Sequence, residues 1–214
     1  MKTPSTTPTR TNGGTVDGEE NVARTVAGLL RLRWWCAPMV EQSDCAFRKL
    51  CRALKCGVAS TPMIQARSFV QSERYRAQWI LHGDPVVCAT TWPSDSIAQT
   101  IPGIREGVPD LHFTLSVADA PLVVQFAGND PHYLAAATVL VADKCEAVEL
   151  NLGCPQSCAR NGHYGAYLMD DIPLVMQIVR QMKQAAPAVA ILAKGTKIKR
   201  AGRTDYNSSV YFLD

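Results

Sequence analysis

The sequence has no run of about 18 consecutive apolar residues, so we expect no helical membrane span. It contains neither a GxGxxG nor a GxxxxGK[ST] motif, which argues against a Rossmann fold and against a P-loop. The eight cysteines include no tight CxxC pair, and Cys154 and Cys158 stand in a looser CxxxC spacing. This spacing does not favour zinc, and we expect no metal site.

The N-terminus lacks the apolar core of a secretory signal. Acidic residues at Asp17, Glu19 and Glu20 also fit poorly with a mitochondrial presequence. We therefore expect a reducing compartment, the cytoplasm or else the nucleus, in which the thiols stay free.

The composition is that of a globular protein. The chain has 214 residues, of which 47% are hydrophobic and 19% charged, which excludes collagen-like, coiled-coil and wholly disordered classes. The net charge of +3 reflects a local cluster without acidic residues: Lys194, Lys197, Lys199, Arg200 and Arg203. Without this cluster the chain has 17 basic and 19 acidic residues, so charge alone makes a weak case for binding nucleic acid.

Composition divides the chain into four segments. Residues 1–28 are rich in Thr, Pro, Ser and Gly, which predicts a disordered tail. Residues 29–199 form the expected domain, interrupted at about 82–120 by a stretch with little periodicity that we interpret as a surface insertion or lid. Residues 200–214 are interpreted as a divergent basic tail.

Strands and helices alternate through the expected domain. Short apolar runs predict strands, a period of 3.6 residues predicts helices, and Asp44 and Asp130 are placed to cap two of them. The predicted strands are 32–37, 58–60, 122–126, 147–152 and 189–193, and the predicted helices are 44–57, 69–80, 131–142 and 173–186. Strands that are apolar on both faces favour a parallel sheet of the α/β class, covered by helices.

The size of the domain predicts part of a (β/α)8 TIM barrel. A complete barrel takes about 250 residues. The chain without its tail and insertion retains about 145, enough for about five β/α units of about 30 residues each. The active site of such a barrel lies where the strands end, and Pro38-Met39, Gln125 and Asn151 to Pro155 follow or end predicted strands.

A cysteine, Cys154, lies at this edge. Gly153 lets the backbone turn after the strand, so the thiol projects beyond the strand end. Such a thiol can act as a nucleophile, a metal ligand or a proton donor, and it can also be an inert cysteine buried at a turn.

An ordered set of motifs resembles the tRNA-dihydrouridine synthases. The resemblance covers about residues 35–80 and 121–194. It rests on Ala37-Pro38-Met39-Val40, Phe47-Arg48, Pro121 to Phe126, Asn129-Asp130-Pro131, Glu149 to Pro155, and Gly162 to Leu168. Val40 to Asp44, Tyr75-Arg76 and Gly162-His163-Tyr164-Gly165 resemble the eukaryotic subgroup that modifies positions sixteen and seventeen of the tRNA D-loop.

This resemblance implies a flavin-binding barrel that uses FMN and NADPH to reduce uridine in tRNA to 5,6-dihydrouridine. By the same resemblance a hydride passes from the flavin to C6 of uracil, and the neutral thiol of Cys154 donates a proton to C5. The target base leaves its stack to reach the flavin.

The resemblance also implies the binding residues. Pro38, Met39 and Val40 are expected along the isoalloxazine, Gln125 at the flavin ring edge, and Asn151 facing the uridine. A lysine is expected at the pyrimidine edge of the flavin, where its charge would stabilise a reduced anionic ring. The spacing from Gly165 favours Lys194, with Lys197 as the competing match.

A second hypothesis is a catalytically incompetent fragment that at most binds RNA or protein weakly. The resemblance stops beyond Lys199, and an incomplete barrel leaves an open sheet edge. The family's FMN-phosphate loops have no counterpart here, so we expect the chain alone to bind FMN poorly and to be inactive. Nothing in the sequence indicates an oligomeric state.

Overall fold

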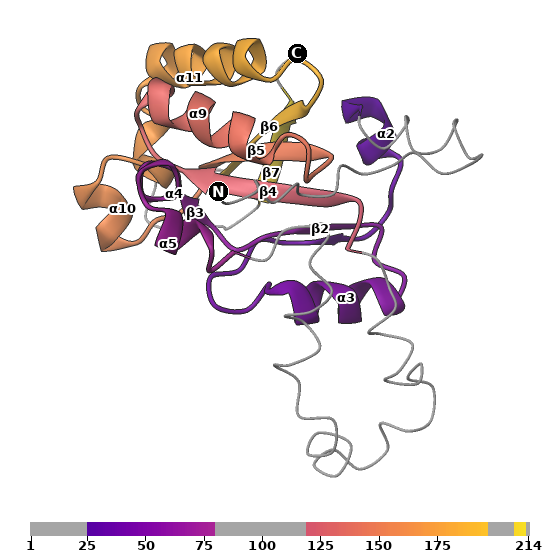
Figure 1. The fold of residues 1–214 in the computed structure, drawn as a ribbon. Helices are drawn as coiled ribbons and strands as arrows, with labels where there is room; N and C mark the ends of the chain where they lie inside the picture. The colour runs from indigo at the N-terminus through magenta and orange to yellow at the C-terminus, as the bar shows by residue number, and fades with distance from the viewer. Residues whose placement is uncertain (1–24, 80–118, 197–207, 213–214) are drawn as a thin grey trace, which may run out of the picture.

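The computed structural model describes residues 25–79, 119–196 and 208–212, which share one seven-stranded sheet (Figure 1). Five parallel strands follow one another in chain order: β1 (Trp35–Cys36), β2 (Val58–Ser60), β4 (Leu122–Ala127), β5 (Ala147–Leu152) and β6 (Ala190–Thr196). The short β3 (Ile64–Gln65) also pairs with β4, and β7 (Ser208–Phe212) runs antiparallel to β6.

Both faces of the central strands are buried, as the apolar runs predicted. All six residues of β4 and all six of β5 are buried. Parallel strands in chain order, each followed by helical segments up to β5, are the arrangement of a (β/α)8 barrel. The structure therefore confirms a partial TIM barrel of the α/β class.

Capping residues begin three of the connecting helices. Asp44 accepts a hydrogen bond from the Phe47 amide at 2.8 Å at the start of α3 (Cys45–Ala53). Asp130 caps α9 (Pro131–Val141), and Asp171 caps α11 (Ile172–Ala185). These three helices confirm the predictions for their segments to within a few residues at each end.

The single helix predicted over 69–80 is wrong. The segment forms α4 (Ala66–Gln71) and α5 (Glu73–Arg76), separated at Ser72. Ser72 has an extended backbone, with φ of −122° and ψ of 110°, and its hydroxyl accepts a hydrogen bond from the Tyr75 amide at 3.2 Å. A serine that caps the next helix in this way ends the preceding one.

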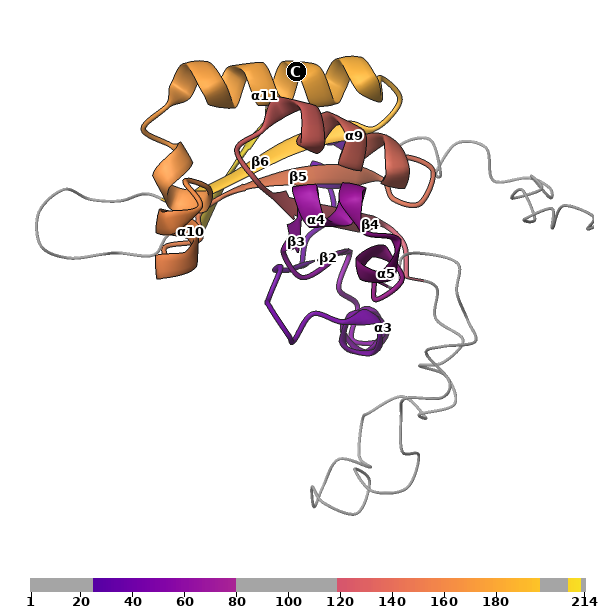
Figure 2. The same cartoon turned by 60° about the vertical axis from the view of Figure 1, so that its left-hand side comes forward.

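Two apolar cores lie on opposite faces of the sheet. On the outer face α4, α9 and α11 cover the strands (Figure 2), and Phe126, Leu150 and Ile191 face them. On the inner face Leu29, from the short α2 (Val26–Leu30), packs with Val123 and with Ala147, Ala190 and Leu192. Since side chains alternate along a strand, Gln125, Glu149 and Asn151 share the inner face with this second core.

The last parallel strand is longer than predicted. β6 continues to Thr196 instead of ending at Ala193: β5 pairs with it as far as Gly195, and β7 pairs with it from Leu192↔Phe212 to Thr196↔Ser208. No strand was predicted at 208–212. The predicted disordered tail ends too late, because α2 already begins at Val26 with Thr25 as its cap. Residues 1–24 of this tail and most of the predicted insertion at about 82–120 lie outside the described residues, so there both remain predictions. Within the described segments no helix has the length and apolarity needed to cross a bilayer.

Candidate active site at the carboxyl edge of the sheet

Three neighbouring strands bring polar side chains together on the inner face. Gln125 on β4 stands in register with Glu149 on β5, and Asn151 on β5 stands in register with Lys194 on β6. Gln125 and Glu149 are each 1% exposed, whereas Lys194 is half-buried. The sheet therefore juxtaposes three of the predicted site residues, namely Gln125, Asn151 and Lys194.

A hydrogen-bonded chain joins the first three of these side chains. Asn151 Nδ2 donates to Gln125 Oε1 at 2.9 Å, and Gln125 Nε2 donates to Glu149 Oε1 at 2.5 Å. The backbone amide of Gln125 donates to the hydroxyl of Thr61 at 3.1 Å, which connects these hydrogen-bonded side chains to the end of β2. Buried polar groups with such complete partners hold fixed orientations.

Asn151 also fixes the turn that carries Cys154. Its Oδ1 accepts hydrogen bonds from the backbone amides of Gly153 and Cys154, both at 2.9 Å. This Asx-type turn ends β5 and places Cys154 just beyond the strand, as predicted. The thiol is partly exposed, and its sulfur lies 3.9 Å from Gln156 Oε1.

The Cys154 turn rests against the segment after α10 (Ser157–Asn161). Gly165, the first residue of the 3₁₀ helix η1 (Gly165–Leu168), has a positive φ of 63°. The amide of Ala166 donates to the Cys154 carbonyl at 3.0 Å, and the Tyr167 hydroxyl donates to the Pro155 carbonyl at 3.1 Å. One main-chain and one side-chain donor thus hold the carbonyl groups of this turn.

Pro38, Met39 and Val40 lie in the loop that follows β1, at the same edge of the sheet. The Met39 amide donates to Ser43 Oγ at 2.9 Å, and Ser43 Oγ donates back to the Met39 carbonyl at 3.2 Å. These bonds close the loop onto the start of α3. The loop is held separately from the hydrogen-bonded chain of Gln125, Glu149 and Asn151.

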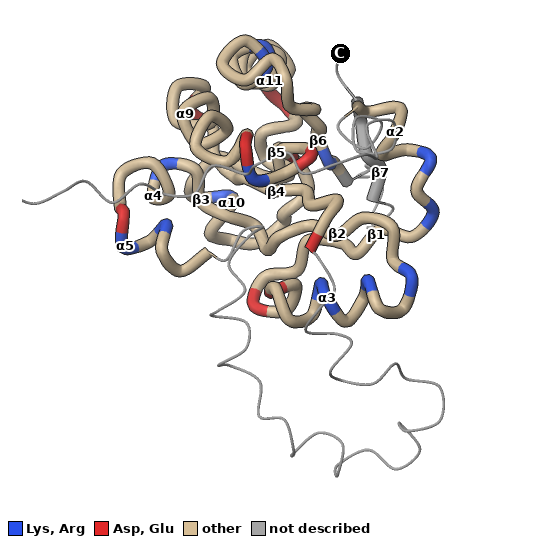
Figure 3. The backbone as a smooth tube through the Cα atoms, turned by 45° about the vertical axis from the view of Figure 1, so that its right-hand side comes forward, with Lys and Arg blue, Asp and Glu red and all other residues tan. Residues whose placement is uncertain are grey.

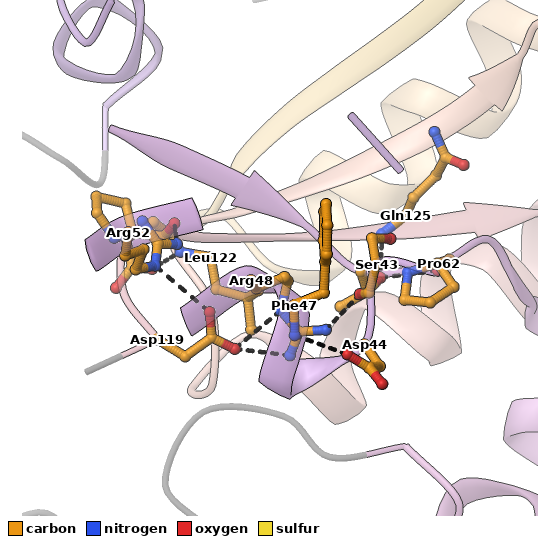
Figure 4. A network of polar contacts seen from close by, with 12 residues as sticks. Ser43, Asp44, Phe47, Arg48, Arg52, Pro62, Asp119, Leu122 and Gln125 are labelled. Atoms are coloured by element: carbon orange, nitrogen blue, oxygen red, sulfur yellow. Dashed lines mark hydrogen bonds and ion pairs between the residues drawn. The ribbon is translucent and has the colours of Figure 1, made fainter. Parts of the chain in front are cut away.

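Arg48 on α3 supports this loop from below (Figure 4). Its guanidinium donates to the Ser43 carbonyl at 2.8 Å and to Asp119 Oδ2 at 2.6 and 2.9 Å. Arg52 reaches the other carboxylate oxygen of Asp119 at 3.4 Å and also donates to the Pro121 carbonyl. Sequence reasoning quoted Arg48 within a motif and gave it no role, because its partner lies 71 residues away.

Glu149 is the second residue that sequence reasoning left without a role. Burial raises its pKa to about 7, although the hydrogen bond from Gln125 and then the charge of Lys194 act in the opposite direction. The signal was present in the sequence as a carboxyl group inside an apolar strand, two residues before Asn151. A buried carboxyl group with a strongly raised pKa marks a candidate functional position.

Cys158, which stands on α10, is exposed and lies 3.6 Å from Gln156 Oε1. Burial is the main cause that raises the pKa of nearby Tyr164 to about 12, and its contact with the Cys158 thiol adds to the effect. Among the residues that the structure describes, no group of three or more His, Cys, Asp or Glu side chains is placed to hold a metal ion.

Lys and Arg residues gather along α3 and the segment between α2 and β1 (Figure 3). Of the predicted basic cluster, Lys194 lies within β6, whereas the competing Lys197 lies outside the described residues. A pocket of about 260 Å³ lies between Gln65, Tyr133 and Tyr164. It does not include Gln125 or Asn151.

The chemistry of the edge residues fits a flavin ring. The pyrimidine edge of an isoalloxazine alternates carbonyl and N–H groups, which an amide and an ammonium group complement. Glu149 engages one Nε2 hydrogen of Gln125 in the hydrogen bonds described above, and the second hydrogen remains for a ligand. Gln125 and Lys194 could therefore hold this edge of the ring.

Comparison with known proteins agrees with this architecture. The sequence model of the dihydrouridine synthase family (Dus) matches residues 35–85 and 104–206. The chain is 40% identical over 146 residues to the tRNA-dihydrouridine(16/17) synthase [NAD(P)(+)] of Saccharomyces cerevisiae, which covers 68% of this chain and 27% of the yeast protein. It is 33% identical over 164 residues to the (16/17) synthase-like protein of Mus musculus, covering 77% and 27% of the two chains.

A mouse tRNA-dihydrouridine(20a/20b) synthase-like protein is 35% identical over 148 residues, or 69% of this chain and 36% of the mouse protein. The family match defines one class, the dihydrouridine synthases, and the partial barrel is consistent with it. This chain belongs to the dihydrouridine synthase family. The match spans about a quarter of the length of the yeast (16/17) synthase and of its mouse counterpart.

Proposed function

We propose that this chain carries the catalytic portion of an enzyme that reduces uridine to 5,6-dihydrouridine in the D-loop of tRNA, with FMN as cofactor and NADPH as reductant. The observation that carries the proposal is the double hydrogen bond from Asn151 to the backbone of Gly153 and Cys154. It holds a thiol at a fixed position beyond β5, on the edge where barrel enzymes bind their substrates.

Cys154 is the proton donor in this proposal. Reduction of the C5–C6 bond of uracil adds a hydride at C6 and a proton at C5. Bound FMN supplies the hydride. The S–H bond of Cys154 breaks as the C5–H bond forms, and solvent later returns a proton to the sulfur.

The other site residues bind the flavin and orient the uridine. Gln125 and Lys194 hold the pyrimidine edge of the flavin, and Asn151 faces the uridine while it fixes the Cys154 turn. Pro38, Met39 and Val40 present backbone and side-chain surface to the ring from the loop that Ser43 closes. The partner is tRNA, whose target base must leave its stack to enter this edge.

The decisive test is a chimera in yeast. Residues 35–196 replace the matching segment of the yeast (16/17) synthase in a strain that lacks that enzyme, and dihydrouridine at positions sixteen and seventeen is measured in purified tRNA. We expect the chimera to restore the modification, Cys154→Ala to abolish it while FMN stays bound, and Cys158→Ala to leave it intact. A folded chimera that forms no dihydrouridine contradicts the proposal.

A second test uses the chain itself. FMN is titrated into purified 1–214 and followed by flavin fluorescence, and the mixture is then supplied with NADPH and unmodified tRNA. We expect weak binding and no dihydrouridine, because a phosphate is usually held by loops after strands seven and eight of such barrels. Sub-micromolar binding with turnover would show that this half-barrel suffices.

A further inference from the structure

The hydrogen-bonded chain at the inner face has a defined direction. Asn151 Oδ1 accepts two backbone amides, and a backbone N–H can only donate. The oxygen of this side chain must therefore face the Cys154 turn, and its nitrogen must face Gln125. The backbone amides of Gly153 and Cys154 thus fix the orientation of the Asn151 side-chain amide.

The orientation of Asn151 in turn determines that of the Gln125 amide. Since Asn151 presents a donor, Gln125 must present Oε1 to it, which turns Gln125 Nε2 toward Glu149. Only an acceptor can satisfy that nitrogen, and Glu149 Oε1 lies 2.5 Å away. Both side chains are buried, and the Glu149 carboxyl group is the acceptor that the structure places at this nitrogen.

We propose that Glu149 is a positioning residue, which holds the amide of Gln125 through its Nε2 so that the second N–H of that amide is kept as a donor for a bound ligand. Without an acceptor at position 149, the Gln125 amide keeps only its bond from Asn151 and loses the second of the two side-chain bonds that hold its orientation. That the ligand is a flavin ring rests on the function proposed above, whereas the orientation itself does not.

The charge around Glu149 supports this role. Lys194 is the charged neighbour that acts on the Glu149 carboxyl from β6, and Gln125 meets it from β4 as a neutral donor. Burial disfavours the ionised carboxyl, and the same carboxyl group accepts the hydrogen bond from Gln125. An acceptor is available from this group in both protonation states.

The first experiment tests the orientation in the ligand-free chain by nuclear magnetic resonance. The side-chain amide signals of Gln125 are assigned by their loss in Gln125→Leu and followed through a pH titration. In the wild type we expect slowly exchanging signals that move with a midpoint near pH 7. In Glu149→Gln the signals should stay protected and stop moving with pH, because an amide oxygen replaces the acceptor. In Glu149→Leu they should exchange rapidly.

Glu146→Gln is the matched control. Glu146 is another buried glutamate that accepts an N–H, from Leu122 at 2.6 Å, but it lies before β5 at the opposite end of the sheet. It should leave the Gln125 signals unchanged. Gln125 signals that are the same in Glu149→Leu and in the wild type would overturn the proposal. If the leucine variant does not fold, Glu149→Gln decides: Gln125 signals that still move with pH in that variant would overturn the proposal.

The second experiment is a double-mutant cycle on FMN affinity, measured by flavin fluorescence into the millimolar range. Loss of one oriented hydrogen bond should weaken binding by about tenfold in Glu149→Leu. If Glu149 acts through Gln125, the same change in a Gln125→Leu background should weaken binding by less than about twofold. If the losses of FMN affinity from Glu149→Leu and Gln125→Leu simply add in the double variant, Glu149 does not act through Gln125 and its role is merely structural. A wild-type chain that binds no FMN would count against the proposed function in this chain, and the resonance experiment would still decide the role of Glu149.

Discussion

Gly165 packs directly against the backbone of Cys154. A Cβ atom at Gly165 would lie 2.7 Å from the Cys154 carbonyl oxygen and 2.9 Å from the Cys154 Cβ. The φ of Gly165 is +63°, a conformation that a side chain disfavours. A residue without a side chain is therefore required where η1 meets the proposed proton donor.

Gly165→Ala should displace the Cys154 turn and lower the free energy of unfolding by about 1–3 kcal/mol, because it combines backbone strain with a close contact. Urea denaturation measures the loss, and alkylation of Cys154 followed by mass spectrometry measures the displacement. Gly128→Ala is the control, since its nearest contact would be an ordinary 3.6 Å. Equal stability of the two variants would refute this account of Gly165.

Arg48→Ala should destabilise the chain by about 3 kcal/mol, because it leaves the buried carboxylate of Asp119 with only the longer contact to Arg52. It also removes the donor to the Ser43 carbonyl, so the Pro38–Val40 loop should become more accessible to protease. The control is Lys144→Ala, whose ion pair with Asp143 is exposed and should contribute less than about 0.5 kcal/mol. Chemical denaturation of both variants checks the difference.

Asn151→Ala should lower the free energy of unfolding by about 1–3 kcal/mol, because it removes the acceptor of two main-chain amides. It should also speed the alkylation of Cys154, which the Asn151 side chain holds in place. Asn129→Ala is the matched control, because its side chain makes an exposed bond to the Gly162 carbonyl at 3.2 Å. Unchanged alkylation in Asn151→Ala would mean that the turn does not depend on this side chain.

Stability should depend on pH through Glu149. Burial raises its pKa from 4.5 to about 7, so the folded chain holds this proton more tightly than the unfolded chain. The resulting stabilisation is complete below pH 4.5 and is lost as the pH rises through about 7. Across that window the free energy of unfolding should fall by up to about 3 kcal/mol.

Glu149→Gln lacks the titrating group and should lose this part of the pH slope, whatever its absolute stability. Urea titrations of both proteins at a series of pH values measure the two slopes. Parallel slopes would contradict the assignment of the proton to Glu149.

The residues that sequence reasoning interpreted well are those whose signal is local. Asp44 and Asp130 stand next to the helices they cap, and the apolar runs of β4 and β5 need no partner to be recognised. Cys154 could be placed beyond its strand because Gly153 and Pro155 surround it in the sequence.

The missed features depend on distant partners. The role of Arg48 requires Asp119, and that of Glu149 requires Gln125 in register on the next strand. Ser72 divided a predicted helix because its hydroxyl caps the segment that follows, a choice that helical periodicity does not reveal. The strand at Ser208–Phe212 exists only through its pairing with β6, which extends β6 in turn to Thr196.

Strand β7 also decides how the barrel can close. One edge of β6 is taken by β5, and the other by β7 through five residue pairs. A sheet edge accepts one strand at a time, and a (β/α)8 barrel needs a parallel strand at this position. Any sixth parallel strand must first displace β7. Closure at this edge is therefore a competition between two strands for the same backbone groups, not the simple addition of one.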